Sequence, residues 1–352
     1  MAQGWESKSV ESHIEPADER AALAKLPKFT PDQAEDSPKY LPTKSRLLHD
    51  ALPTVVRALL CIAIAGGSLM GAQQFHIDHV TVAGKNLEAL EKALTQAGVR
   101  NQYGGQYSDH VTEMAMASFP DGSYLELIAI QPMAEPSKVA AHEWRKFMQG
   151  DAGPCAWAVR PPNLFAEAER LTVSKIPVGV LRQNGRKRPD GVQVDWETAQ
   201  VGPTYGGFFP FLLRDVTPHD NRAFPSGRPP EHGFTGWTGI ARVVIAVRDL
   251  DAAIALYRQA YWIDPPDRQV DAEFGAKLAW FQGTPVVLAA PLSPKSWLSD
   301  RLEKFGEAPC AFILGPWKGS FTMAGAKSKW FGHSVFWADA GQLGWHLGFQ
   351  PR

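Results

Sequence analysis

The stretch Asp121-Gly122-Ser123-Tyr124-Leu125-Glu126-Leu127-Ile128-Ala129-Ile130 decides the fold of this chain. An Asp-Gly turn leads into a strand that is apolar on both faces, and Glu126 is its single carboxylate. A carboxylate that is buried without a cation or a metal costs several kcal/mol. Glu126 therefore needs a partner, and the sequence offers His79 within the segment His76–Val82.

The composition is that of an ordinary globular chain. Its 352 residues, of which 44% are hydrophobic and 21% charged, suffice for two domains. A formal net charge of -1 and the absence of a long basic run give no indication of a nucleic-acid partner. The triplet Arg186-Lys187-Arg188 precedes Pro189-Asp190-Gly191, which predicts a solvated hairpin loop. Three cysteines do not make a disulfide framework, and we expect Cys155 and Cys310 to be small buried hydrophobes.

The first 72 residues differ from the rest of the chain. Residues 1–54 are polar, which predicts disorder, or sequence upstream of a true start near Val55 or Val56. Residues 55–72 combine Arg57, a short apolar run and two small residues, as a secretory signal peptide does. A membrane anchor is the alternative, although the run is short for a span. We expect a secreted or periplasmic mature protein without a membrane partner, or a cytoplasmic one if residues 57–72 are not used as a signal.

Beyond residue 74 the chain repeats itself. Residues 77–83 align with residues 240–246 at an offset of 163 (240 - 77), and the same offset pairs Leu87 with Leu250. The order of matching segments is kept, so we expect two half-proteins of similar plan. They are residues 75–215 and residues 237–350, joined by a Pro- and Gly-rich linker at residues 216–236.

Each half divides again into units of one strand, one helix and further strands. In the first half we expect helices at 86–97, 137–149 and 163–172, and strands at 77–83, 114–119, 123–130, 155–159, 178–182, 192–198 and 208–214. In the second half we expect a helix at 249–260 and strands at 240–247, 277–282, 285–290, 310–314, 333–338 and 344–349. Units of this kind predict an α+β fold in which curved mixed sheets pair and enclose a cavity.

A family resemblance rests on these motifs. The opening strand with Asp78-His79-Val80, the closing strand with Tyr124-Leu125-Glu126-Leu127 and the internal repeat resemble the vicinal oxygen chelate superfamily, in particular its glyoxalase-like domains. The resemblance covers residues 75–215 well and residues 236–349 more loosely. It implies tandem βαβββ modules of the glyoxalase and extradiol-dioxygenase type.

The same resemblance implies a divalent metal held by the opening-strand histidine and the closing-strand glutamate, which by position are His79 and Glu126. Such a metal would bind two substrate oxygens and stabilise an enediolate or related anion, with Glu126 as a catalytic residue. This donor set suits Fe, Mn, Ni or Zn without choosing among them. The plainer alternative is that His79 and Glu126 form a buried pair that only supports the sheet.

The chain also departs from the family pattern, in which a second module completes the site. Ala156 stands at the His79 position of the second module, and Arg242 stands there in the third, so the second half is expected to be degenerate. A third ligand must come from elsewhere. His110, just before a strand, and His219, just after the second module, are the candidates.

Two functions remain open from the sequence. One is a metal-dependent enzyme of lyase, isomerase or dioxygenase type that acts on a small oxygenated substrate in the first half. The other is a metal-free protein that binds or sequesters a hydrophobic small molecule, as the missing second-module ligands suggest. The 12 tryptophans fit an aromatic-lined cavity and equally a two-sheet core. No feature of the sequence sets the oligomeric state.

Overall fold

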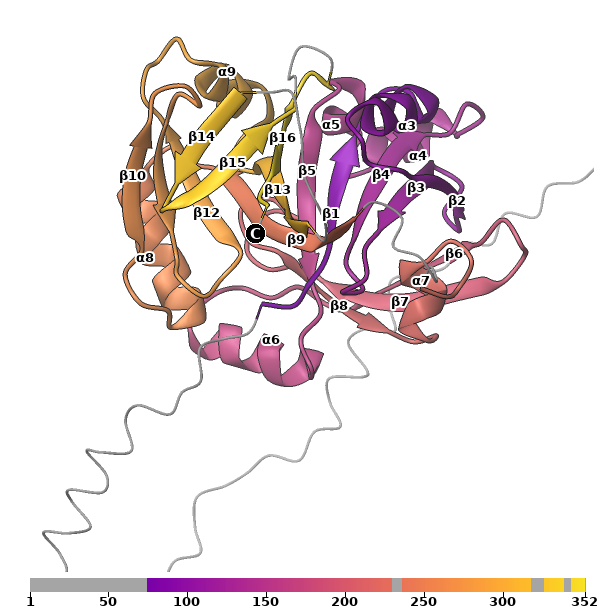
Figure 1. Cartoon of the computed structure of the whole chain (residues 1–352). Coiled ribbons are helices and arrows are strands. Elements are labelled where there is room, and N and C mark those ends of the chain that lie inside the picture. The colour runs from indigo at the N-terminus through magenta and orange to yellow at the C-terminus, as the bar shows by residue number, and fades with distance from the viewer. Residues whose placement is uncertain (1–74, 230–235, 318–325, 339–342, 352) are drawn as a thin grey trace, which may run out of the picture. The chain divides into compact units, whose positions relative to one another are not determined.

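The computed structural model describes residues 75–229, 236–317, 326–338 and 343–351, which form two curved sheets of eight strands each (Figure 1). Both sheets mix parallel and antiparallel strands, and the described helices are few. The α+β fold of curved mixed sheets is therefore confirmed. None of the described helices is both long enough and apolar enough to span a membrane. The expected extension and signal segment, residues 1–72, lie outside the described residues.

The first half closes into a barrel with the strand order β1-β4-β3-β2-β6-β7-β8-β5. Its strands are β1 (Ile77–Ala83), β2 (Gln102–Tyr107), β3 (Thr112–Ser118), β4 (Tyr124–Ile130), β5 (Gly153–Val159), β6 (Arg182–Lys187), β7 (Gln193–Ala199) and β8 (Phe211–Asp215). Its helices are α3 (Leu87–Gln96), α4 (Pro136–Ala141), α5 (Arg145–Gln149), α6 (Leu164–Val173) and α7 (His219–Ala223). The barrel has two seams between modules: β1 pairs with β5 over six residue pairs, whereas β2 pairs with β6 over two.

The second half forms an open sheet with the order β10-β11-β12-β9-β13-β16-β15-β14. Its strands are β9 (Trp237–Ala246), β10 (Asp267–Asp271), β11 (Ala276–Trp280), β12 (Val286–Pro291), β13 (Pro309–Trp317), β14 (Ala326–Trp330), β15 (His333–Trp337) and β16 (His346–Phe349), and its helices are α8 (Leu250–Tyr261) and α9 (Trp297–Phe305). The Gln269 side chain on β10 donates to the Lys329 carbonyl on β14 at 2.6 Å, so the two edge strands lie side by side (Figure 1). The sheet is therefore nearly closed.

The two sheets repeat one local plan. Strand β1 lies between parallel β4 and antiparallel β5, and β9 lies in the same way between parallel β12 and antiparallel β13. This duplication agrees with the offset of 163 read from the sequence.

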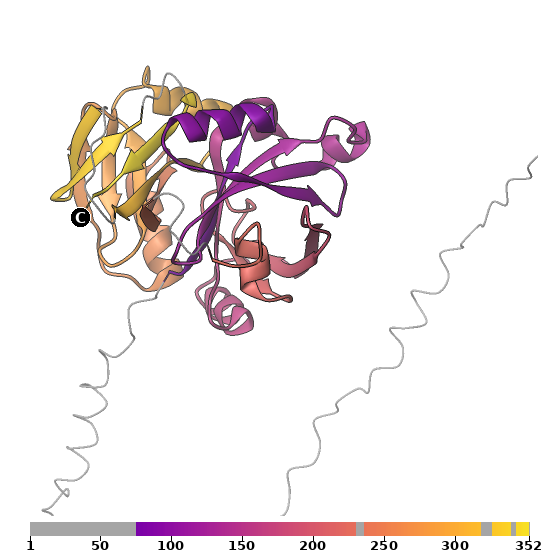
Figure 2. The ribbon, with the colours of Figure 1, turned by 45° about the vertical axis from the view of Figure 1, so that its right-hand side comes forward.

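The closing strand β4 separates its two faces as its alternation predicts. Leu125 and Leu127 face the main core, which also contains Val80 and Val82 of β1. Helix α3 covers the outer face of β3 and β4 and adds Leu94 to that core (Figure 2). The opposite face of β4, which carries Glu126, is thereby turned to the barrel interior.

Buried contacts also join the two halves. The Arg301 guanidinium of α9 donates to the carbonyls of Ala152 and Pro154 in the first half and of Pro309 in the second. Gly153 has a left-handed φ of 68°, and a Cβ there would lie 2.2 Å from the ring of Trp345. Only glycine allows this close approach.

Some of the expected elements are wrong. Strands β2, β10 and β14 were not expected, because their polar sequences lack the apolar alternation of an inner strand. The expected helix 137–149 is two short helices, α4 and α5, interrupted at His142, whose ψ of 129° is extended. The strand expected at 178–182 is replaced by β6, which begins at Arg182.

The basic triplet is not a solvated loop either. Arg186 is buried on β6, and its guanidinium donates to the Gly104 carbonyl at 2.6 Å and the Arg222 carbonyl at 2.8 Å. Backbone carbonyl oxygens can satisfy a buried guanidinium, so Arg186 needs no carboxylate partner. Cys155 and Cys310 are buried free thiols, as expected.

Candidate functional site

A cavity of about 260 Å³ lies inside the first barrel. Its buried polar residues are His79, Glu126, Thr112 and Thr198. Aromatic side chains make up much of its wall: Tyr107, Tyr124, Trp144, Trp196, Tyr205 and Phe211. Asp109, Glu143 and Arg182 are exposed residues of the lining, so a charged rim surrounds an aromatic interior.

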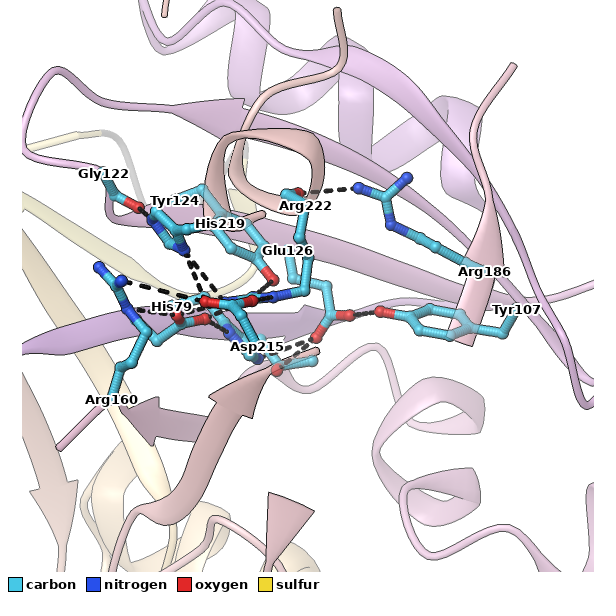
Figure 3. Close-up of polar contacts among 12 residues, drawn as sticks. His79, Tyr107, Gly122, Tyr124, Glu126, Arg160, Arg186, Asp215, His219 and Arg222 are labelled. Carbon is cyan, nitrogen blue, oxygen red and sulfur yellow. Dashed lines mark hydrogen bonds and ion pairs between the residues drawn. The ribbon is translucent and has the colours of Figure 1, made fainter. Parts of the chain in front are cut away.

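Strand register brings His79 and Glu126 together. In the parallel pair β1–β4, Thr81 lies opposite Glu126 and His79 lies opposite Tyr124, so all four side chains share the face toward the cavity. The distance from His79 Nε2 to Glu126 Oε2 is 3.6 Å (Figure 3). The two residues that the sequence singled out are therefore neighbours in a buried site.

Two hydroxyl groups hold the Glu126 carboxylate. Thr81 Oγ1 donates to Oε2 at 2.6 Å, and the Tyr107 hydroxyl donates to Oε1 (Figure 3). A carboxylate oxygen has two lone pairs, so each oxygen keeps one for a further donor or a metal. The two hydroxyls therefore orient the carboxylate and leave it able to bind a ligand.

Asp78 orients the imidazole of His79. The pairing of β1 with β5 is irregular between Ile77 and His79, so one extra residue, Asp78, is accommodated there. Such a bulge disturbs the alternation of side chains, and Asp78 Oδ1 lies 2.7 Å from His79 Nδ1. An ionised carboxylate accepts this bond from Nδ1–H, which turns Nε2 toward Glu126.

Arg222 of α7 neutralises Asp78. Its Nη1 and Nη2 donate to the two Asp78 oxygens at 2.7 and 2.6 Å, and its Nε donates to Asp215 Oδ1 at 2.5 Å (Figure 3). Burial alone would raise the pKa of Asp78, but the Arg222 charge and the hydrogen bonds from His79 and Arg222 outweigh it and hold that pKa well below its usual range. Asp78 is therefore the charged acceptor that the orientation of His79 requires.

Asp78, Asp215 and His219 also form a cluster of the size that could hold a metal ion. Arg222 already pairs with both carboxylates, so a metal there would sit against a buried guanidinium. His219 has Nδ1 3.0 Å from Asp215 Oδ2 and Nε2 3.1 Å from the Gly122 carbonyl oxygen, so both ring nitrogens are engaged. This cluster is better explained as an ion-pair network that supports His79.

The two proposed third ligands do not meet His79 and Glu126 in the cavity. His110 lies in the exposed β2–β3 turn with a left-handed φ of 60°. Neither His110 nor His219 is among the residues that line the cavity. The facing strands offer no substitute, because Ala158 of β5 lies opposite His79 and the Phe211 ring of β8 is 5.4 Å from the imidazole.

The chemistry of the remaining donors nevertheless fits a metal with two protein ligands. Two ligand atoms that each lie about 2.1 Å from a tetrahedral ion are about 3.4 Å apart, close to the observed 3.6 Å between His79 Nε2 and Glu126 Oε2. The other coordination positions would be left to substrate oxygens or water. Sites with three or four protein ligands are commoner, so the fit is that of an open site.

Sequence reasoning missed three residues of this site. Asp78 is adjacent to His79, but strict alternation assigns it to the opposite face. Tyr107 lies on a polar strand that the apolar pattern does not reveal. Arg222 lies in the segment that we expected to be a linker, 144 residues from the carboxylate that it binds.

Comparisons with known proteins give a family match and several structural similarities. A family model described as a glyoxalase-like domain matches residues 77–261. A hypothetical protein from Staphylococcus aureus is similar in structure, with a TM-score of 0.56, 11% identity, and coverage of 79% of this chain and 100% of that one. At these identities the similarity shows the fold alone, and no curated protein matches the chain.

Two enzyme structures match more weakly. Methylmalonyl-CoA epimerase from Mycobacterium tuberculosis has a TM-score of 0.28 and 18% identity over 33% of this chain and 89% of its own. A mutant 4-hydroxymandelate synthase from Streptomyces coelicolor has a TM-score of 0.44 and 10% identity over 68% of this chain and 70% of its own.

Proposed function

The chain belongs to the glyoxalase-like domain family of the vicinal oxygen chelate superfamily, and from that premise we propose that its first barrel is the active site of a divalent-metal-dependent enzyme. The proposed substrate is a small oxygenated molecule, and the proposed reaction is of lyase, isomerase or dioxygenase type. The observation that carries the proposal is the orientation of His79. Its Nδ1 is bound to Asp78, which leaves Nε2 facing Glu126 Oε2 at 3.6 Å in the barrel cavity.

The residues of the cavity have separate roles in this proposal. His79 and Glu126 hold the ion, which when bound would polarise substrate oxygens as a Lewis acid. Tyr107 and Thr81 keep the Glu126 carboxylate in place, and the Tyr107 hydroxyl is a proton donor within reach of that carboxylate. The aromatic wall lowers the polarity around the buried carboxylate, which strengthens the polar interactions there.

The rim of the cavity carries one cation, Arg182, beside two acids, Asp109 and Glu143. Arg182 lies on the cavity lining, with its guanidinium 4.9 Å from the Tyr205 ring and 3.0 Å from Glu143 Oε1. An arginine in this setting binds a planar carboxylate in two-point fashion once it leaves its surface partner. Arg182 is therefore available to a substrate carboxylate only when its pair with Glu143 opens.

The test is the metal content of the purified full chain, measured by mass spectrometry after reconstitution with Fe, Mn, Ni or Zn. Near-stoichiometric metal is expected in the wild type and in His333→Ala, a control that removes an exposed histidine of the second half. His79→Ala and Glu126→Ala should each lose it. Asp78→Asn should weaken metal affinity roughly 10- to 100-fold, because the imidazole loses its charged orienting partner.

A second candidate function is metal-free binding of a hydrophobic small molecule. It is favoured by the facing positions Ala158 and Phe211, which offer no metal ligand. Wild-type protein without metal after reconstitution, and without a metal-dependent rise in melting temperature, would refute the enzyme proposal. Unchanged metal content in both His79→Ala and Glu126→Ala would refute the assignment of the ligands.

A further inference from the structure

Arg242 occupies in the second half the place that His79 occupies in the first. The offset of 163 relates the two residues, and β9 has the same strand neighbours as β1. Alternation puts Arg242 on the face of β9 that carries Val244 and Ala246, which pack into the apolar core of the second sheet. The Arg242 side chain is a charged group in this apolar setting, since the residue is 4% exposed.

Arg242 lacks the partners that the other buried arginines have. Within the described part of the chain, buried Arg188 and Arg222 donate to carboxylates, and Arg186 and Arg301 donate to backbone carbonyls. Arg242 Nη1 is enclosed without any hydrogen-bond acceptor. Burial lowers the pKa of Arg242 to about 10, so the guanidinium remains charged at neutral pH. A buried cation with an unused donor is costly unless an anion completes it.

Aromatic rings surround this guanidinium. Its carbon lies 4.4 Å from the centre of the Trp280 ring and 6.0 Å from that of Phe331. The Trp280 indole is itself fixed by a hydrogen bond from Nε1 to the Thr284 carbonyl, and exposed His333 packs edge-on against it. Cation–π contact compensates part of the lost hydration, but it supplies no acceptor for the guanidinium N–H groups.

We propose that Arg242 is the anion-recognising residue of a second small-molecule site, whose ligand is a small organic carboxylate with a planar or apolar body. Nη1 is enclosed in this structure, so the carboxylate reaches the guanidinium fork when the surrounding side chains shift, and its body then packs against Trp280 and Phe331. A single arginine in apolar surroundings matches one negative charge better than the two of a phosphate ester. The site is independent of the metal proposal for the first barrel.

The test is isothermal titration calorimetry of the full chain with sodium benzoate as the carboxylate probe, and with inorganic phosphate and sodium chloride at matched ionic strength. Saturable benzoate binding is expected, and Arg242→Met should weaken it at least tenfold. Arg268→Met, which removes an exposed arginine of the same sheet that pairs with Asp251, should bind as the wild type does. His79→Ala should also bind normally, which separates this site from the first.

Any one of three results overturns the proposal. The first is the absence of saturable benzoate binding by the wild type. The others are equal benzoate binding by Arg242→Met and tighter binding of phosphate than of benzoate. If Arg242→Met does not fold, Arg242→Lys keeps the charge but loses the planar fork, and it should weaken benzoate binding at least tenfold. Unchanged binding by Arg242→Lys would then refute two-point recognition by Arg242.

Discussion

Replacing Arg222 with methionine should destabilise the protein by about 3–5 kcal/mol, the usual cost of leaving a buried charge without its partner. Asp78 has no exposed surface, and Arg222 supplies a hydrogen bond to each of its carboxylate oxygens. Without Arg222, the cation closest to Asp78 is Arg160, whose Nε is 3.5 Å away on a side chain that is 37% exposed. Partial solvation makes Arg160 a weak substitute.

A double-mutant cycle separates charge pairing from simple packing loss. Asp78→Asn removes the charge that Arg222→Met leaves behind, so the double variant should be more stable than Arg222→Met alone by about 1–2 kcal/mol. Urea unfolding at neutral pH measures the stability of the single and double variants. An unchanged slope of unfolding free energy against urea concentration indicates that the unfolded state is the same. Arg160→Met is the matched control and should lose about 1 kcal/mol or less.

The pH dependence of the free energy of unfolding tests the same pair of Asp78 and Arg222. Because the folded pKa of Asp78 is lowered, its contribution to stability is present above the unfolded value of about 3.9 and is lost as the pH falls below that value. The gap between the wild type and Arg222→Met should therefore narrow in acid. A loss under 1 kcal/mol in Arg222→Met, or a double variant as unstable as the sum of its parts, would refute the reasoning.

Three further stability predictions follow from buried groups, each measured by urea unfolding. Burial, with a smaller effect of the Arg301 charge, lowers the pKa of His346 from 6.5 to about 4. The free energy of unfolding should therefore fall by up to about 3 kcal/mol as the pH drops from 6.5 to 4. His346→Gln should lack this pH dependence, and an equal dependence in the variant would contradict the prediction. Gly153→Ala should lose about 2–3 kcal/mol through its left-handed φ and the Trp345 ring, and wild-type stability would be the contrary result. Arg301→Met should lose about 2–4 kcal/mol, since buried carbonyls of both halves lose their donor; a neutral effect would show that water replaces it.

Local patterns in the sequence predict the central part of the fold. Strand β4 has a strict alternation of period two, and its faces in the structure are those that the alternation indicates. The meeting of His79 with Glu126 follows from the parallel pairing of two such strands, as the family resemblance implies. Both depend on residues within about fifty positions of one another.

The rest of the site depends on pairings that no local pattern contains. Asp78 reaches His79 only because β1 takes an irregular register against β5. Tyr107 reaches Glu126 from a strand whose polar residues pair across a seam of the barrel. Arg222 comes from a segment whose glycines and prolines are typical of a linker, and only the folded chain brings it to Asp78.

The unequal seams of the barrel have a consequence for its opening. Local unfolding favours places where few backbone bonds must break, and β2 meets β6 through two residue pairs, as β5 meets β8, while β1 meets β5 through six. One of the two pairs contains Tyr107, the residue that donates to Glu126. Parting of this seam therefore admits solvent and withdraws a hydroxyl from the buried carboxylate in a single event, and amide hydrogen exchange at Ser108, whose N–H donates to the Gly185 carbonyl across the seam, reports how often Glu126 is released.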